Sequence, residues 1–353
     1  MKSGDFRRPA VAALVLVVAL LMVTAAGAGS QRGPTVDLSV AQANFGSSDA
    51  VLVKLTYSNP TKHTVHVLAW LTAAEALDAP IFKVTRDGQP VAYTGPIVKR
   101  PRAGAGDYVS LKAGEQLTRV VDLGDAYDLS QSGDYEIVYN VSSADLFGVK
   151  NSAAAPDSLV SASVRINVTG RAANGKPGGG GGGTPGFTAC SAGQQAQLTE
   201  ARANATNYAG IATGYLNAGI AGARYTTWFG ASTTTRFNEV KGNFAKIAAA
   251  FSPTTAITFD CSSKRNVYAY VYPNQPYKIY LGRVFWTAPA LGTDSKAGTL
   301  IHEMSHFDVV AGTDDVVYGQ TGAMALAISD PDAAITNADS HEYFAENNPA
   351  AAS

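Results

Sequence analysis

Two histidines and a glutamate near residue 300 have the types and spacing of a zinc hydrolase site. The segment from His302 to His306 reads H-E-M-S-H, with Glu303 directly after the first histidine. On a helix, residues four apart share a face, so the two imidazoles can bind one metal ion while Glu303 lies beside its open position. A catalytic zinc usually takes three protein ligands, so a third His, Asp or Glu must return to the same place.

The segment that follows offers this third ligand. Gly312 is the point where the helix is expected to end and reverse, and the acidic pair Asp314 and Asp315 comes shortly after it. Tyr318 and Gly319 complete a G-T-x-D-x-x-Y-G pattern. The alternative interpretation is an exposed helix with two unrelated histidines. The second motif argues against this alternative.

With both motifs, the chain resembles the aspzincin metallopeptidases, the family of deuterolysin and the peptidyl-Lys metalloendopeptidases. The resemblance implies that one zinc ion is bound by His302, His306 and Asp315. It also implies that Glu303 is the general base and that Tyr318 donates to the transition state, while Asp314 is a variable, solvated position. A non-catalytic secreted module with a structural zinc is the competing interpretation, but a structural zinc is normally closed by four protein ligands and the motif supplies three.

The end of the chain suggests a substrate preference. Asp339 and Glu342 are three apart in a predicted helix over 337–347, so both carboxylates face the same way. In the peptidyl-Lys branch that the segment resembles, an acidic pair here binds the lysine that follows the cut bond. The sequence therefore predicts cleavage of Xaa–Lys bonds, with broad deuterolysin-like cleavage as the alternative. A second interpretation is that Asp339 only caps the helix with Glu342 in its first turn. His341 is expected to point away from this face.

Charge narrows the class of partner. The net charge is −1, which argues against a nucleic-acid partner and leaves protein or peptide substrates. From Ala297 to Ser353 there is no Lys or Arg but there are nine carboxylates. Part of this excess belongs with a bound dication, and the rest favours a cationic substrate.

The amino terminus predicts export. Residues 1–28 read as a signal peptide, with basic residues before an apolar run and a small-residue cleavage site. We therefore expect a secreted protein without stable membrane association once the signal is removed. Cys190 and Cys261 fit an oxidising compartment and are expected to form a disulfide worth about 2–4 kcal/mol.

A glycine-rich linker over 171–186 is predicted to divide the mature chain. Before it, residues 29–170 contain about seven short alternating stretches typical of an antiparallel, all-β immunoglobulin-like sandwich. They lie at 51–57, 65–71, 82–84 with 91–93 across an Asp87-Gly88 turn, 108–111, 117–123, 135–141 and 160–168. The resemblance implies a removable pro-region that masks the active site in cis, as in a zymogen; a permanent accessory module is the alternative. Self-processing at Gly175-Lys176 is a hypothesis that follows from Xaa–Lys cleavage.

Residues 187–353 form the predicted catalytic domain, with the α+β order of zincin metallopeptidases. Helices are expected over 194–216 and 233–251, followed by strands at 256–261, 267–272 and 277–281. The buried stripes are predicted to be Leu198, Tyr208, Ile211 and Tyr215 on the first helix and Phe237, Val240, Phe244 and Ile247 on the second. Asp294 or Ser295 is expected to cap the active-site helix. One of the last two strands is expected to line the cleft and to take up the substrate's backbone.

Overall fold

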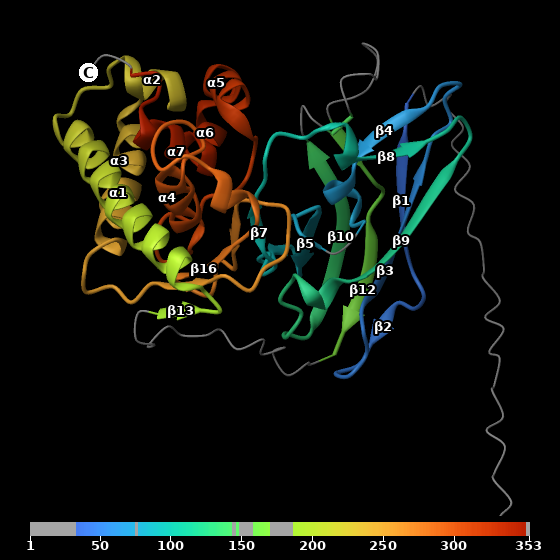
Figure 1. Ribbon diagram of the computed structural model, residues 1–353. Coiled ribbons are helices and arrows are strands. Elements are labelled where there is room, and N and C mark those ends of the chain that lie inside the picture. Colours follow the sequence, from blue (N-terminus) through green and yellow to red (C-terminus); the bar gives the residue numbers. More distant parts are fainter. Residues whose placement is uncertain (1–32, 75–76, 143–145, 148–157, 170–185, 351–353) are drawn as a thin grey trace, which may run out of the picture. The chain divides into compact units, whose positions relative to one another are not determined.

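The computed structural model describes residues 33–74, 77–142, 146–147, 158–169 and 186–350. Arg32–Ser353 hold together as one unit, and this unit contains two hydrophobic cores. One core lies among strands before residue 170, which we call the β-rich part, and the other lies in the helical part after residue 185 (Figure 1). The predicted signal peptide and the predicted linker up to residue 185 lie outside the described residues.

The β-rich part is built from short strands with three 3-10 turns between them. The strands are β1 (Thr35–Val40), β2 (Asn44–Phe45), β3 (Leu52–Ser58), β4 (Val65–Leu68), β5 (Phe82–Arg86), β6 (Gln89–Pro90), β7 (Ile97–Lys99), β8 (Tyr108–Leu111), β9 (Gln116–Asp122), β10 (Gly133–Ser142), β11 (Ser158–Val160) and β12 (Val164–Val168). The 3-10 turns are η1 (Ala69–Thr72), η2 (Ala105–Asp107) and η3 (Leu123–Asp125). The sheets have the orders β1-β3-β9, β2-β12-β10-β5-β6 with β11 on β10, and β4-β8. Only β7 among these strands pairs into the sheet of the helical part.

Several predicted strands are confirmed, and local features of the chain explain where some of them begin and end. In β3 the side chains of Val53, Leu55 and Tyr57 are buried in alternation, as the pattern predicts. The β5–β6 hairpin turns through Asp87 and Gly88, both with positive φ, as a tight two-residue turn requires. The prediction of seven antiparallel strands was incomplete, because it missed β1, β2 and β7, and β2 pairs parallel to β12. The strand predicted to reach residue 71 ends at residue 68, where η1 begins.

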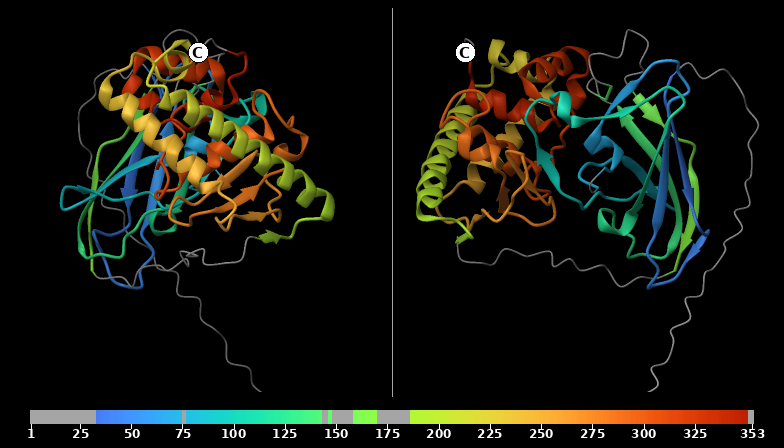
Figure 2. Two further views of the ribbon diagram at one scale, coloured as in Figure 1. Left: turned by 90° about the vertical axis from the view of Figure 1, so that its left-hand side faces the viewer. Right: turned by 45° about the vertical axis from the view of Figure 1, so that its right-hand side comes forward.

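The helical part consists of helices and one small sheet. The helices are α1 (Ala192–Asn217), α2 (Ala223–Phe229), α3 (Thr234–Ala250), α4 (Lys296–His306), α5 (Gly319–Ser329), α6 (Pro331–Ala334) and α7 (Ala338–Glu346), with a 3-10 turn η4 (Val284–Thr287). The strands are β13 (Gly186–Thr188), β14 (Thr258–Asp260), β15 (Ala269–Val271) and β16 (Lys278–Leu281), in the order β13-β14-β16-β15-β7. The two long helices and the three predicted strands are thus confirmed within a few residues. Helix α1 packs beside α3 and α4 (Figure 2).

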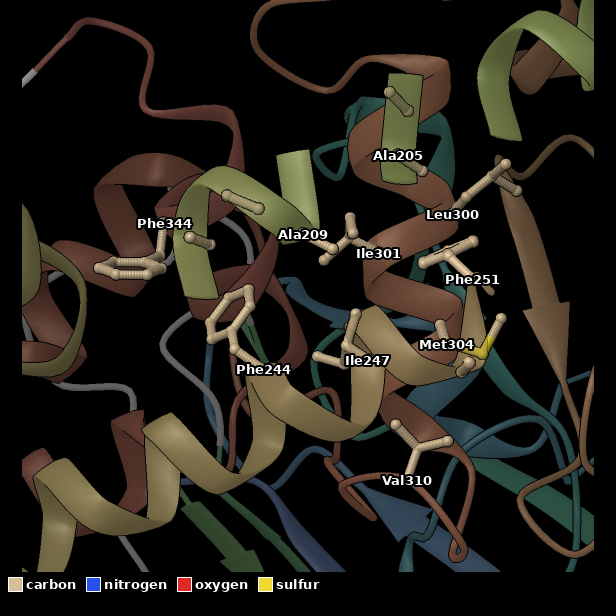
Figure 3. Close-up of a cluster of buried hydrophobic side chains, with 14 of the residues drawn as sticks. Ala205, Ala209, Phe244, Ile247, Phe251, Leu300, Ile301, Met304, Val310 and Phe344 are labelled. Carbon is tan, nitrogen blue, oxygen red and sulfur yellow. The ribbon is translucent and has the colours of Figure 1, made fainter. Parts of the chain in front are cut away.

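The buried face of α1 differs from the predicted stripe. Ile211 is exposed, and the fully buried face is made of Leu198, Ala201, Ala205, Ala209, Ala212 and Leu216. Figure 3 shows Ala205 and Ala209 close to Leu300 and Ile301 of α4. Small side chains let the two helix backbones approach closely, so alanines rather than the larger residues form the contact. On α3 the predicted stripe is confirmed, with Val240, Phe244 and Ile247 buried.

Helix α4 runs through the core of the helical part. All residues from Ala297 to His306 are buried, and Ser295 caps the helix by accepting a hydrogen bond from Gly298 N at 2.9 Å. A Cβ at Gly298 would lie 2.0 Å from Glu346 Oε1, so glycine permits the close approach of α4 and α7 here. The predicted helix end at Gly312 was wrong, since α4 ends at His306. Gly312 instead turns the following loop with φ of 59°.

Candidate active site

Three atoms suited to bind a metal converge at the end of α4. Nε2 of His302, Nε2 of His306 and a carboxylate oxygen of Asp315 lie within 4.8 Å of one another. Asp315 Oδ1 is 3.0 Å from His302 Nε2 and 3.5 Å from His306 Nε2, yet within the described chain none of the three atoms makes a hydrogen bond. Ligands of a tetrahedral zinc lie about 3.3 Å apart when each is about 2.0–2.1 Å from the metal. The spacing and the unsatisfied buried atoms therefore fit one zinc ion.

The other ring nitrogen of each histidine has a close oxygen neighbour. His306 Nδ1 lies 2.7 Å from the carbonyl oxygen of Thr313, and this hydrogen bond orients the ring and leaves the Nε2 lone pair free for a metal. His302 Nδ1 lies 2.9 Å from Asp339 Oδ1 and 3.2 Å from Glu342 Oε2, close contacts that lack hydrogen-bond geometry. The loop turned by Gly312 supplies the first neighbour and α7 supplies the others.

The charges around the histidines favour a cation. Burial lowers the pKa of His306 to about 4, so this imidazole is neutral, as a ligand must be. Burial alone would lower the pKa of His302 as well, but Asp315 raises it well above its usual range. The carboxylate of Asp315 thus stabilises positive charge at the point where the three ligand atoms meet.

Glu303 lies beside this group, fully buried on α4. Among the described residues neither of its carboxylate oxygens has a hydrogen-bond partner. Burial raises the pKa of Glu303 well above its usual range, with His302 opposing the shift. A buried carboxyl without a hydrogen-bond partner among the described residues, beside two candidate metal ligands, is suited to accept and return a proton.

Tyr318 is placed by the start of α5, where it is the N-cap residue. Its hydroxyl lies 3.0 Å from Asp315 Oδ2 and 3.1 Å from the carbonyl oxygen of Val98. Burial raises the pKa of Tyr318 well above its usual range, so the phenol stays protonated and acts as a donor. The structure places this residue beside Asp315, and its predicted role as a donor in the transition state stays a prediction.

Asp339 and Glu342 form a buried acidic pocket on the other side of His302. Both lie on α7 and have almost no solvent exposure. The helix begins after Asn337, so the interpretation of Asp339 as a simple cap was wrong. Asp339 Oδ2 instead accepts a hydrogen bond from the backbone N–H of Gly319 at 2.6 Å. Asp339 therefore links α7 to α5 and to His302.

A lysine that the sequence did not single out fills this pocket. Lys99 Nζ lies 2.5 Å from Glu342 Oε2 and 3.4 Å from both Asp339 Oδ1 and Asp294 Oδ1. Lys99 is 1% exposed. Burial alone would lower the pKa of its ammonium, but Asp339 and Glu342 outweigh burial and hold the pKa well above its usual range. Lys99 is more than 190 residues from each of these partners in sequence, so no local motif could have identified it.

Lys99 lies on the strand at the edge of the sheet. Its strand, β7, pairs antiparallel with β15, and β16 lies between β14 and β15. The Lys99 ammonium lies 5.1 Å from the centre of the Tyr268 ring. That one of these strands takes up the substrate's backbone stays a prediction.

The remaining residues named in the sequence analysis lie outside the metal group and the acidic pocket. His341 does point away from the acidic pocket: its ring is buried, stacks on Phe244 at 5.5 Å and lies 3.0 Å from the carbonyl oxygen of Asn337 through Nδ1. Asp314 is exposed, as expected. Cys190 and Cys261 form the predicted disulfide, which joins the start of α1 to the end of β14.

Within the described residues, no helix has the length and apolar character needed to cross a membrane.

Comparisons with known proteins show which family the chain resembles in sequence. The model of the aspzincin family, described as lysine-specific metallo-endopeptidase, matches residues 215–346. The chain is 43% identical over 314 residues to an extracellular protease of Aeromonas hydrophila, covering 86% of this chain and 90% of that protein. It is 51% identical over 168 residues to the peptidyl-Lys metalloendopeptidase of Pleurotus ostreatus, covering 47% of this chain and 99% of that protein. The solved structure of a zinc peptidase from Grifola frondosa matches 46% of this chain and 99% of that chain, with 44% identity and a TM-score of 0.44.

Proposed function

Since the chain belongs to the aspzincin family of metalloendopeptidases, we propose that it is a secreted zinc endopeptidase that cuts the peptide bond before a lysine. The observation that carries this proposal is the acidic pocket of Asp339 and Glu342 beside His302. A lysine ammonium there forms charge-assisted hydrogen bonds, whereas an apolar side chain would leave two buried carboxylates unpaired. The pocket therefore favours Xaa–Lys cleavage over the broad cleavage of a deuterolysin-like enzyme.

The residues of the site divide the chemistry between them. Zinc, held by His302, His306 and Asp315, would polarise the scissile carbonyl and acidify a water. Glu303 takes the proton of the attacking water and returns it to the leaving amine. The protonated hydroxyl of Tyr318 donates to the oxygen that becomes negative as the carbonyl is attacked. The motif offers three protein ligands and not the four that normally close a structural zinc, so a zinc held there would keep one position for water, which favours an enzyme over a structural zinc module.

The proposal extends to the organisation of the chain. Residues 1–28 are a cleaved signal peptide, residues 29–170 an immunoglobulin-like sandwich, residues 171–186 a linker and residues 187–353 a zincin-type catalytic domain. The two separate hydrophobic cores support this division. Self-processing before Lys176, which lies outside the described residues, would separate the two parts. Amino-terminal sequencing of the secreted protein tests this, and an intact chain from residue 29 through the linker contradicts it.

A digest with mapped cut sites tests the activity itself. The zinc-loaded Lys99→Ala protein, whose acidic pocket is free of the chain's own lysine, is incubated with a denatured protein substrate, and the new amino termini are identified by mass spectrometry. We expect lysine at the new amino terminus of most products, and no cleavage with a metal chelator or in Glu303→Ala. Chelator-sensitive cuts spread over many residue types would favour the broad alternative. Cleavage unaffected by chelator would contradict a zinc enzyme.

A further inference from the structure

Strand β7 of the β-rich part occupies the edge of the helical part's sheet. Ile97, Val98 and Lys99 face Val271, Tyr270 and Ala269 of β15 in antiparallel register. A further backbone hydrogen bond runs from Tyr268 N to the carbonyl oxygen of Lys99 at 3.0 Å. A peptide that adds to a sheet edge gains main-chain hydrogen bonds from this pairing, and side-chain pockets select its sequence.

The carbonyl group before Lys99 lies at the candidate catalytic residues. The oxygen of Val98 accepts a hydrogen bond from the Tyr318 hydroxyl at 3.1 Å. The same hydroxyl is 3.0 Å from Asp315, one of the three metal-binding residues. In an enzyme that cuts Xaa–Lys, the carbonyl that is attacked belongs to the residue before the lysine. Val98 is that residue here.

The side chain of Lys99 also lies where the lysine of a substrate is expected. Its ammonium lies against Glu342 and Asp339, and the rings of Tyr268 and Tyr343 flank it at 5.1 and 5.9 Å. A lysine placed only for stability at an interface has no need of a metal-site tyrosine on the preceding carbonyl. Backbone pairing, carbonyl contact and ammonium pocket all fall on three consecutive residues.

We propose that residues 97–99 occupy the substrate cleft in cis, with Val98-Lys99 at the position of a scissile Xaa–Lys bond. The full chain is then self-inhibited by its own lysine, and substrate enters only after the β-rich part is removed or β7 leaves the sheet edge. This inference rests on the proposed function, because it takes the pocket of Asp339 and Glu342 as the lysine subsite.

Peptide binding to the full chain tests the proposal without relying on turnover. In a zinc-loaded Glu303→Ala background, fluorescence anisotropy measures binding of a labelled peptide with one central lysine and of a matched peptide with methionine in its place. Lys99→Ala is expected to bind the lysine peptide at least roughly tenfold more tightly than the parent, because the cleft is no longer filled. Lys83→Ala, an exposed lysine on β5, is the matched control and should bind like the parent.

Each result has a defined meaning. Equal binding of the lysine peptide by the parent and folded Lys99→Ala overturns the proposal, as does a gain of the same size in Lys83→Ala. If Lys99→Ala does not fold, as judged by circular dichroism, Lys99→Met keeps the aliphatic chain and is held to the same criterion. A gain that is equal for the lysine and methionine peptides supports occupation of the cleft but contradicts the lysine preference. The two ideas therefore fail separately.

Discussion

The two sides of His302 face different electrostatic environments. On its Nε2 side are the second imidazole of His306 and a single carboxylate, Asp315. On its Nδ1 side are two carboxylates, Asp339 at 2.9 Å and Glu342 at 3.2 Å, with the ammonium of Lys99 between them. One side offers two imidazoles and one carboxylate, a set suited to a dication, and the other offers two carboxylates that already hold an ammonium.

The difference suggests a way to separate catalysis from specificity. Asp339 contacts both His302 and Lys99. Under the proposed function, the group beside a metal-binding histidine would also bind the substrate lysine, and metal binding and substrate recognition would be coupled through one imidazole. Substitutions on the two sides should separate these roles.

The largest effect is expected on the metal side. Asp315→Ala should lose both zinc and activity, whereas Glu303→Ala should keep zinc and lose roughly 10²- to 10⁴-fold in kcat, because only proton transfer is removed. Zinc content is measured by elemental mass spectrometry and turnover with a lysine peptide, in the Lys99→Ala background so that the cleft is open. Near-normal turnover by Glu303→Ala would refute its role.

In the acidic pocket we expect smaller losses of activity, and substitutions of Asp339 and Glu342 should differ in their effect on zinc binding. Glu342→Gln is expected to lower kcat/KM for lysine peptides roughly 10- to 100-fold, because one charged hydrogen bond is lost, and to weaken zinc less than Asp339→Asn does, because Glu342 lies farther from His302 Nδ1. Asp339→Asn should do the same and also weaken zinc binding roughly 10- to 100-fold through His302. Glu200→Gln, an exposed acid on α1, is the control. Equal zinc affinity in both pocket variants contradicts the coupling.

His341 provides a contrast to His302, because no carboxylate contributes to the shift of its pKa. Burial lowers the pKa of His341 to about 4, while the unfolded chain protonates near 6.5. The unfolded state therefore binds more protons between these values, and stability falls as the pH drops from 6.5 to 4. At pH 5 this contributes a loss of about 2 kcal/mol. Chemical unfolding of the metal-free protein at pH 7 and 5 should show a smaller loss in His341→Phe, and identical losses would contradict the assignment.

The smallest expected effect is on stability, and it concerns the contact between α4 and α7 at Gly298. Gly298→Ala should destabilise the fold by about 1–2 kcal/mol, because the new Cβ meets buried Glu346, which is hydrogen-bonded to Ser295. Gly210→Ala on α1 has open space around it and is expected to be neutral or stabilising by up to about 1 kcal/mol. Thermal unfolding compares the two variants. A Gly298→Ala variant as stable as Gly210→Ala would show that α4 and α7 can move apart at little cost.

The sequence could bring the candidate metal-binding residues together because their spacing is local. Two histidines one helical turn apart, and an aspartate within the next ten residues, leave few alternatives. The buried face of α1 was misjudged because alanine is weakly hydrophobic, while its small size decides how close α4 can come. Strand β7 could not be predicted, because three residues carry no periodicity and its partner strand is about 170 residues away. Lys99 could not be predicted as a pocket residue either, because its partners are also far away in the sequence.

The most direct test is the crystal structure of zinc-loaded Glu303→Ala with anomalous scattering at the zinc edge. The structure predicts one zinc peak, bound by Nε2 of His302, Nε2 of His306 and an oxygen of Asp315 at about 2.0–2.1 Å, with Lys99 still on Glu342. A second group, formed by His302, Asp339 and Glu342, is close enough to compete for the ion. A zinc peak within that group, with Lys99 displaced, would contradict the division of roles between the two sides of His302.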